Sequence, residues 1–176
     1  MEEIQTKRKT YQALLKLGTQ TDTGDTEGKI IKEAAIPELT PEKLAAVEKK
    51  FVGTHMQTPP QFSAKKVNGK SAYKYARKGI KVELKAKEIT IHSLKIDNTN
   101  IDEILFTVSC SSGTYIRVLG EEIAEALGTV GHLETLTRTS IGEYHIQKAV
   151  TPDEIEKELQ YEKNILELQQ KEASLN

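Results

Sequence analysis

Apolar and polar residues alternate along the segment TYQALLKL, residues 10–17. Every second position is apolar, and only Leu14 interrupts the alternation (Tyr11, Ala13, Leu15, Leu17). A period of two is typical of a β-strand with one buried face, so the pattern predicts a strand that ends at Gly18. The residues that follow, TQTDTGDTEGK, are rich in Thr, Asp and Gly and predict a polar loop or the tip of a hairpin.

A helical pattern occupies LTPEKLAAVEKKFVG, residues 39–53. Thr40 suits the N-cap position and Pro41 the first helical position. Apolar residues then recur at helical spacing until Gly53, which predicts the end of the helix (Leu44, Val47, Phe51). The segment therefore predicts an amphipathic helix.

Further elements are predicted in the second half of the chain. SAYKYARKG predicts a short helix closed by Gly79, and strands are predicted around residues 81–86 and 88–96 and in DEILFTVSC, residues 102–110. After a turn at 111–113, apolar residues recur at helical spacing up to a stop at Gly128 (Ile116, Leu119, Ile123, Leu127). These elements indicate an α+β fold with a mixed, largely antiparallel sheet flanked by helices.

Composition excludes several classes of protein. The 176 residues suffice for one domain of ordinary size, and 37% hydrophobic and 29% charged residues indicate a globular chain. The apolar runs are too short to span a membrane and the N-terminus does not resemble a secretory signal, so we expect a cytoplasmic protein. One cysteine and four scattered histidines predict neither an internal disulfide nor a metal site.

Charge is unevenly distributed along the chain. The net charge is −1, yet residues 65–85 carry +7, which leaves −8 on the remainder. Tyr73 and Tyr75 lie within this basic block. Its lysines could neutralise nucleic-acid phosphates while the tyrosine rings stack on bases or pack against sugars. The alternative is a solvated helix face followed by an edge strand protected by lysines.

Three longer segments resemble a known family. KTYQALLKLGTQTDTGDTEG, QTPPQFSAKKVNGKSAYKYARKG and CSSGTYIRVLGEEIAEALG, the last followed by GHLETLTRTSIGEY, occur in this order between Lys9 and Val150. Their order and spacing resemble those of the bacterial tRNA pseudouridine-55 synthases, the TruB family. The resemblance implies an isomerase that flips a uridine out of the tRNA T-loop, breaks its glycosidic bond and rejoins the base through carbon. It implies no cofactor and no metal.

The same resemblance implies a domain organisation and roles for individual residues. Residues 1–150 would form a portion of the pseudouridine synthase catalytic domain, and residues 151–176 an acidic tail of helical composition. Tyr11 would stack on the target base, Tyr115 would line the base pocket and Leu136 would close it. Arg117 would pair with the catalytic aspartate. The basic segment would face the T-arm of tRNA (Lys65, Lys66, Lys70, Lys74, Arg77).

Each of these roles has an alternative based on packing alone. Tyr11 and Leu136 could be ordinary core residues of strands or helices, and Tyr115 could pack at a helix end. Arg117 could form an exposed ion pair with Glu121, four residues further along a helix, worth a few tenths of a kcal/mol.

The essential aspartate of the family lies in a G-T-L-D-P-like motif well before the KTY motif, whereas eight residues precede Lys9 here. None of the five aspartates follows a Gly-Thr-Leu sequence (Asp22, Asp25, Asp97, Asp102, Asp153). We therefore expect the 176 residues alone to be inactive and poorly stable. Three explanations stay open: a fragment of an ordinary synthase, the larger half of a split enzyme completed by a second polypeptide, or a noncatalytic RNA-binding remnant.

Overall fold

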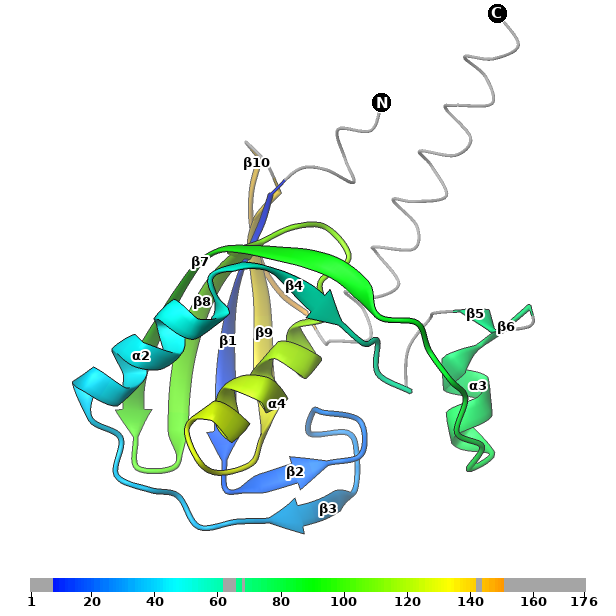
Figure 1. The fold of residues 1–176 in the computed structure, drawn as a ribbon, viewed down its shortest axis with the longest axis horizontal. Coiled ribbons are helices and arrows are strands. Elements are labelled where there is room, and N and C mark those ends of the chain that lie inside the picture. Colours follow the sequence, from blue (N-terminus) through cyan, green and yellow to red (C-terminus); the bar gives the residue numbers. More distant parts are fainter. Residues whose placement is uncertain (1–7, 62–65, 68, 142–143, 151–176) are drawn as a thin grey trace, which may run out of the picture.

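A six-stranded antiparallel sheet forms the centre of the computed structural model (Figure 1). The structure describes residues 8–61, 66–67, 69–141 and 144–150. The strands follow the order β10-β9-β1-β8-β7-β4 across the sheet (β1 Lys9–Leu17, β4 Gly53–Gln57, β7 Lys87–Asn100, β8 Glu103–Cys110, β9 Gly131–Ile141, β10 Tyr144–Val150). The predicted α+β class with a largely antiparallel sheet is confirmed.

Strand β1 is a central strand, because it pairs with β8 on one side and β9 on the other. The alternating pattern in the sequence matches the observed burial: the apolar set Tyr11, Ala13, Leu15 and Leu17 is buried on one face, whereas Gln12 is exposed. Leu14 lies in the opposite set of positions and is half-buried. One face of the sheet therefore belongs to the core.

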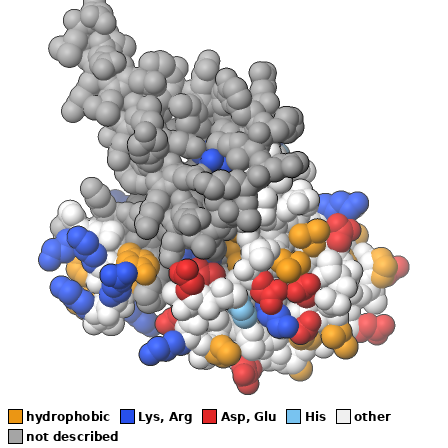
Figure 2. Space-filling model, turned by 180° about the vertical axis from the view of Figure 1, so that it is seen from behind, with side chains coloured by type: hydrophobic (Ala, Val, Ile, Leu, Met, Phe, Trp, Pro, Cys, Tyr) orange, Lys and Arg blue, Asp and Glu red, His pale blue; other side chains and the backbone are white. Residues whose placement is uncertain are grey.

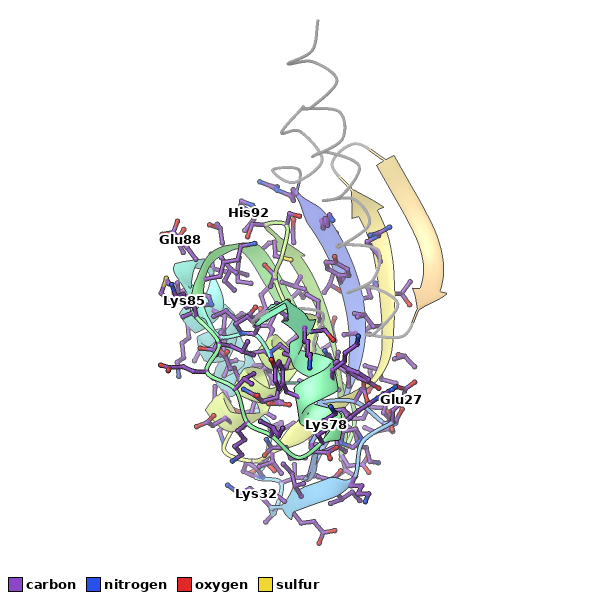
Figure 3. The ribbon with its side chains drawn as sticks, turned by 90° about the vertical axis from the view of Figure 1, so that its right-hand side faces the viewer. Glu27, Lys32, Lys78, Lys85, Glu88 and His92 are labelled. Atoms are coloured by element: carbon purple, nitrogen blue, oxygen red, sulfur yellow. The ribbon has the colours of Figure 1, made fainter. Side chains whose placement is uncertain are left out.

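Helices α2 (Pro41–Phe51) and α4 (Ile116–Ala126) contribute to a single hydrophobic core with this face, α2 against β7 and α4 against β9 (Figures 1 and 3). Both helices were predicted from the sequence. The Thr40 side chain caps α2, accepting a hydrogen bond from the Lys43 N–H at 3.2 Å. Gly128, at φ +93°, follows the end of α4.

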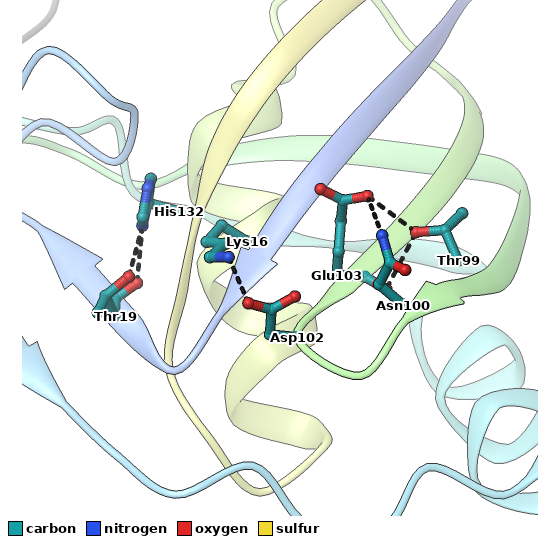
Figure 4. Close-up of polar contacts among 7 residues, drawn as sticks. All are labelled: Lys16, Thr19, Thr99, Asn100, Asp102, Glu103 and His132. Carbon is teal, nitrogen blue, oxygen red and sulfur yellow. Dashed lines mark hydrogen bonds and ion pairs between the residues drawn. The ribbon is translucent and has the colours of Figure 1, made fainter.

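The polar segment after β1 forms a hairpin of β2 (Thr19–Thr21) and β3 (Ile30–Glu33), which confirms the predicted hairpin. Its first strand is tied to β9, because the His132 ring donates from Nδ1 to the Thr19 carbonyl oxygen at 2.8 Å (Figure 4). Nearby, Lys16 of β1 binds Asp102 of the β7–β8 turn, and this hydrogen bond holds the pKa of Asp102 below its ordinary value. These contacts fix the end of the sheet from which the hairpin leaves.

Three features differ from the sequence prediction. Residues 81–86 are not a strand, and one long strand, β7, covers the region of the predicted strand 88–96. Strands β4, β5 (Lys66–Val67), β6 (Lys70–Ser71), β9 and β10 were not predicted. The predicted acidic tail, residues 151–176, lies outside the described residues. Within the described part of the chain, no helix is long and apolar enough to cross a membrane.

Candidate functional site

Tyr11 and Leu136 lie on the helix-covered face of the sheet. Tyr11 of β1 is opposite Arg138 of β9, and the next residue on the same face, Ala13, is opposite Leu136. Tyr11 is 1% exposed and Leu136 is 2% exposed, and both belong to the hydrophobic core. The structure thus brings the two together on one face at neighbouring positions. Their roles at the base stay predictions, and their burial also suits the packing alternative.

Two buried cations flank Tyr11, and the sequence analysis assigned them no role. Lys9 precedes Tyr11 on the same face of β1, and Arg138 lies directly across from it on β9. Lys9 is also opposite Cys110 of β8, a buried thiol whose pKa is raised to about 12 by desolvation. A buried cation needs compensating groups, so this corner of the sheet is more polar than the apolar pattern of β1 indicates.

The segment between β8 and α4 turns sharply and places Tyr115 at the start of α4. Thr114 Oγ donates to the Ser111 carbonyl oxygen at 2.9 Å, and Gly113 adopts a φ of +85°. Glycine suits this position because of its positive φ, whereas a Cβ would meet only the flexible end of the Lys87 side chain, which can move aside. Tyr115 is half-buried and is the N-cap residue of α4.

Gln57, at the end of β4, holds Tyr115 through its backbone. The side-chain Nε2 donates to the Tyr115 carbonyl oxygen at 3.2 Å, and Oε1 accepts from the Tyr115 N–H at 2.8 Å. The sequence analysis did not single out Gln57. The only signal for it is its place beside the prolines of QTPPQ, which does not by itself reveal a partner in α4.

Arg117 is buried in the first turn of α4, with 2% of its surface exposed. Its Nη1 donates to the Thr23 carbonyl oxygen at 2.8 Å, which ties α4 to the β2–β3 turn. The alternative of an exposed ion pair with Glu121 does not hold as stated, because the arginine is buried. The pairing of Arg117 with a catalytic aspartate stays a prediction.

Glu121 lies close to the same turn and titrates abnormally. Burial raises the pKa of its carboxyl to about 7, while the Arg117 guanidinium acts in the opposite direction. Gly24 makes this arrangement possible, because a Cβ there would lie 2.8 Å from the Glu121 Oε1 and 3.2 Å from the Arg117 Cβ. The close approach of turn and helix requires a residue without a side chain.

Asp25 occupies the same turn and is 2% exposed. Its Oδ1 accepts hydrogen bonds from Thr23 Oγ at 2.7 Å and from the Glu27 N–H at 2.9 Å. Its other oxygen, Oδ2, is buried without a hydrogen-bond partner among the described residues. The sequence analysis treated Asp25 as a loop residue only. The structure instead places a buried carboxylate in the turn that receives Arg117.

The basic residues lie on a separate element, which we call the basic arm, residues 69–85. It contains β6 (Lys70–Ser71) and α3 (Ala72–Arg77), and β6 pairs with β5 (Lys66–Val67) beside the main sheet (Figure 1). The predicted short helix is thereby confirmed. Figure 2 shows Lys and Arg side chains gathered on the side of the molecule where this arm lies.

The arm exposes most of the basic side chains that the prediction assigned to RNA. Lys70, Lys74 and Arg77 are exposed, and the Arg77 guanidinium lies over the Tyr73 ring, 4.5 Å from its centroid. Lys65 lies outside the described residues, and the side chain of Lys66 is not described. Exposed cations beside an aromatic ring suit a phosphate backbone with an adjacent base or sugar.

Nothing in the described part of the chain groups three or more His, Cys, Asp or Glu side chains in a way that could hold a metal ion. Around the β2–β3 turn the structure brings together the buried Arg117 guanidinium and two carboxyls, those of Glu121 and Asp25. These groups can bind, orient and pair with a carboxylate.

The sequence of this chain is similar to those of known proteins. Residues 1–116 match the family model described as TruB family pseudouridylate synthase (N terminal domain). The tRNA pseudouridine synthase B of Hydrogenovibrio crunogenus is 47% identical over 148 residues, covering 84% of this chain and 49% of that protein. That of Francisella philomiragia is 46% identical over 158 residues, covering 89% and 52%. The chain spans about half the length of these curated relatives.

The fold is shared with a solved structure described as a Cbf5-Nop10-Gar1 complex, at a TM-score of 0.55 and 24% identity, over 82% of this chain and 33% of that one. This likeness concerns the fold alone. The family model matches residues 1–116, and the two curated relatives are 46–47% identical over more than four fifths of this chain. The chain belongs to the TruB family of pseudouridylate synthases.

Proposed function

We propose that this chain forms the nucleotide-binding portion of a tRNA pseudouridine synthase that isomerises a flipped uridine of the T-loop. The observation that carries the proposal is the burial of Arg117 at the start of α4, tied to the Thr23 carbonyl oxygen. A guanidinium removed from water is costly unless a negative charge or several acceptors surround it. We propose that a catalytic carboxylate lies beside Arg117 in addition to the Thr23 carbonyl oxygen and Glu121, which already surround it.

The isomerisation breaks the bond between N1 of uracil and C1′ of ribose and forms a bond between C5 and C1′. The hydrogen on C5 leaves as a proton, and N1 gains one. These atoms are out of reach while the base is stacked, so the uridine must be extruded. In the proposed site the rings of Tyr11 and Tyr115 replace the lost stacking, Leu136 provides an apolar wall, and Arg117 orients the carboxylate.

We propose that the reacting aspartate belongs to a segment outside the 176 residues. Asp25 is the one buried aspartate of the described chain, but its Oδ1 is held within its own turn by Thr23 and the Glu27 backbone. A carboxyl fixed in this way is suited to shaping the turn beside Arg117, not to reaching a ribose. In this proposal a segment with the G-T-L-D-P-like motif, belonging either to the same protein or to a second polypeptide, supplies the reacting carboxylate.

The basic arm is proposed to bind the T-arm of tRNA. Its exposed lysines and arginine project from an element apart from the main sheet (Figures 1 and 2), and the rest of the chain is acidic. RNA would be attracted to the arm and repelled by much of the remaining surface. This surface also supports a second candidate function, RNA binding without catalysis.

The two candidates are separated by a complementation assay. The chain is mixed with a polypeptide bearing the missing motif, and release of tritium from C5-labelled uridine in a tRNA transcript is measured. Release above that of either component alone supports the synthase. Binding of T-arm RNA without release supports the binding module.

A further inference from the structure

Gln57 pairs with both backbone polar groups of a single residue, Tyr115. Its side chain is 3% exposed, so water does not compete for these two bonds. A primary amide that donates to a C=O and accepts from the N–H of the same residue restrains that residue in position and in orientation, as a neighbouring strand does. Gln57 therefore fixes the backbone at the entrance to α4.

At the start of helix α4 the Gln57 amide restrains the backbone of the N-cap residue, although it does not itself cap the free N–H groups of the first turn. Tyr115 is the N-cap, and its own side chain does not cap the helix. Gln57 lies 58 residues earlier in the chain, so the restraint comes from a different element, β4. Arg117 is the second residue of α4. The same restraint therefore also sets the position of the Arg117 backbone, from which the guanidinium extends.

Gln61 makes an equivalent pair of bonds to Val82. Its Nε2 donates to the Val82 carbonyl oxygen at 2.8 Å, and its Oε1 accepts from the Val82 N–H at 3.0 Å. Val82 follows α3 in the basic arm. The second glutamine thus ties the arm to the same short segment that holds α4.

The segment between the two glutamines is stiff. Pro59 and Pro60 have a fixed φ, and Pro59 is buried. Residues 57–61 therefore form a short rigid segment with a hydrogen-bonding glutamine amide at each end. Gln57 binds the backbone at the start of α4, and Gln61 binds the backbone of the basic arm.

We propose that Gln57 is a positioning residue that holds Tyr115 and the start of α4 in the geometry required by the flipped uridine, and that Gln61 sets the basic arm relative to it. This inference rests on the proposed function. Tyr115 and Arg117 act at the nucleotide, so releasing them lowers kcat. The arm acts in RNA binding, so releasing it raises KM.

The test uses two matched substitutions in the full chain, Gln57→Met and Gln61→Met. Methionine keeps the length and shape of glutamine and removes the same two hydrogen bonds in each case. In the complemented enzyme, Gln57→Met is expected to lower kcat by roughly tenfold to a hundredfold, the effect of misplacing a reacting group by about 1 Å, with little change in KM. Gln61→Met is expected to raise KM with kcat close to that of the wild type.

Two results would overturn the proposal. One is a wild-type kcat in Gln57→Met. The other is an equal loss of kcat in both variants, since bonds that serve only stability would not divide their effects between kcat and KM. If Gln57→Met does not fold, Gln57→Glu replaces it, because the neutral carboxyl can make both bonds to Tyr115 whereas the ionised carboxylate cannot donate to its carbonyl oxygen. Its kcat should then fall, relative to the wild type, as pH rises.

Amide hydrogen exchange separates this proposal from the proposed function. In the 176-residue chain without RNA, the Tyr115 amide should lose protection in Gln57→Met and keep it in Gln61→Met. If the complemented wild type makes no pseudouridine, the proposed function fails. Amide hydrogen exchange of Tyr115 then remains as the test of whether Gln57 restrains its backbone. Unchanged protection of Tyr115 in Gln57→Met overturns the proposed restraint.

Discussion

Arg117 of α4 donates a hydrogen bond to the carbonyl oxygen of Thr23, 2.8 Å away in the β2–β3 turn. The two residues are 94 positions apart in the chain, so the bond joins elements that meet only in the folded state. The next residue, Gly24, packs against the same helix at a φ of +81°. The position of the arginine therefore depends on the turn that receives it.

Gly24→Ala is expected to destabilise the chain more than Gly79→Ala. Both glycines have positive φ, so each substitution costs about 1 kcal/mol of backbone strain. A Cβ at Gly79 meets open space, whereas at Gly24 it presses on the Arg117 Cβ, which the helix holds in place. Crowding should add about 1–3 kcal/mol. Urea unfolding measures the difference, and equal losses would show that turn and helix do not meet closely.

Glu121 is expected to make stability depend on pH. Its pKa is about 7 in the folded chain against an ordinary 4.5, so the folded state holds a proton that the unfolded state has released. The free energy of unfolding should therefore fall as pH rises from 4.5 to about 7. At pH 8, Glu121→Gln should be more stable than the wild type by roughly 2–3 kcal/mol, with the two converging in acid.

The control for this comparison is Glu125→Gln, which removes the same charge from an exposed position on the same helix. The charge of Glu125 contributes to the raised pKa of Glu122, so its removal should alter the slope of stability against pH, but by less than Glu121→Gln does. Parallel pH curves for the wild type and Glu121→Gln would contradict the burial of the Glu121 carboxyl.

Thr40→Ala is expected to lower the free energy of unfolding by about 1 kcal/mol, because the N–H of Lys43 loses its capping acceptor. Thr40→Ser keeps a hydroxyl in place and should retain most of the stability. Thermal unfolding of the three proteins checks the cap. Similar losses in both variants would point to lost packing of the threonine methyl group instead.

Charge reversal on the basic arm is expected to weaken RNA binding without sequence preference. Lys70→Glu with Lys74→Glu should reduce the affinity for T-arm RNA and lower the slope of log affinity against log salt by about one for each lysine. The matched control reverses Lys49 and Lys50, which are exposed at the end of α2. Equal effects of the two pairs would assign the binding to overall charge and not to the arm.

Local patterns predicted the elements whose boundaries are set locally. The Thr40 cap, Pro41 and the apolar stripe of α2 lie within one short segment, and all three appear as predicted. Residues 81–86 alternate in the same manner as a strand, with Val82 partly buried and Leu84 buried. There, however, the backbone of Val82 pairs with the Gln61 side chain, so alternating burial arises without a strand ladder.

Residues of the candidate site could be predicted from the sequence only where they belong to a recognisable motif. The GTYIR segment led to Arg117, which lies buried at the start of α4, and its pairing with an aspartate stays a prediction. Gln57, Asp25 and Lys9 gave no comparable signal. The contacts of Gln57 and the burial of Lys9 arise between strands and helices that are far apart in the chain. The periodicity of apolar residues within one segment therefore cannot predict them.

The central claim is that Arg117 is half of a catalytic ion pair whose aspartate comes from another segment. The most direct measurement is the single-turnover rate of tritium release from C5-labelled T-loop uridine by the complemented chain, compared for the wild type, Arg117→Ala and Arg117→Lys. We predict release by the wild type, a loss of roughly 10²–10³-fold or more in Arg117→Ala, and a smaller loss in Arg117→Lys. Wild-type rates in a folded Arg117→Ala variant that binds the RNA normally would contradict the claim.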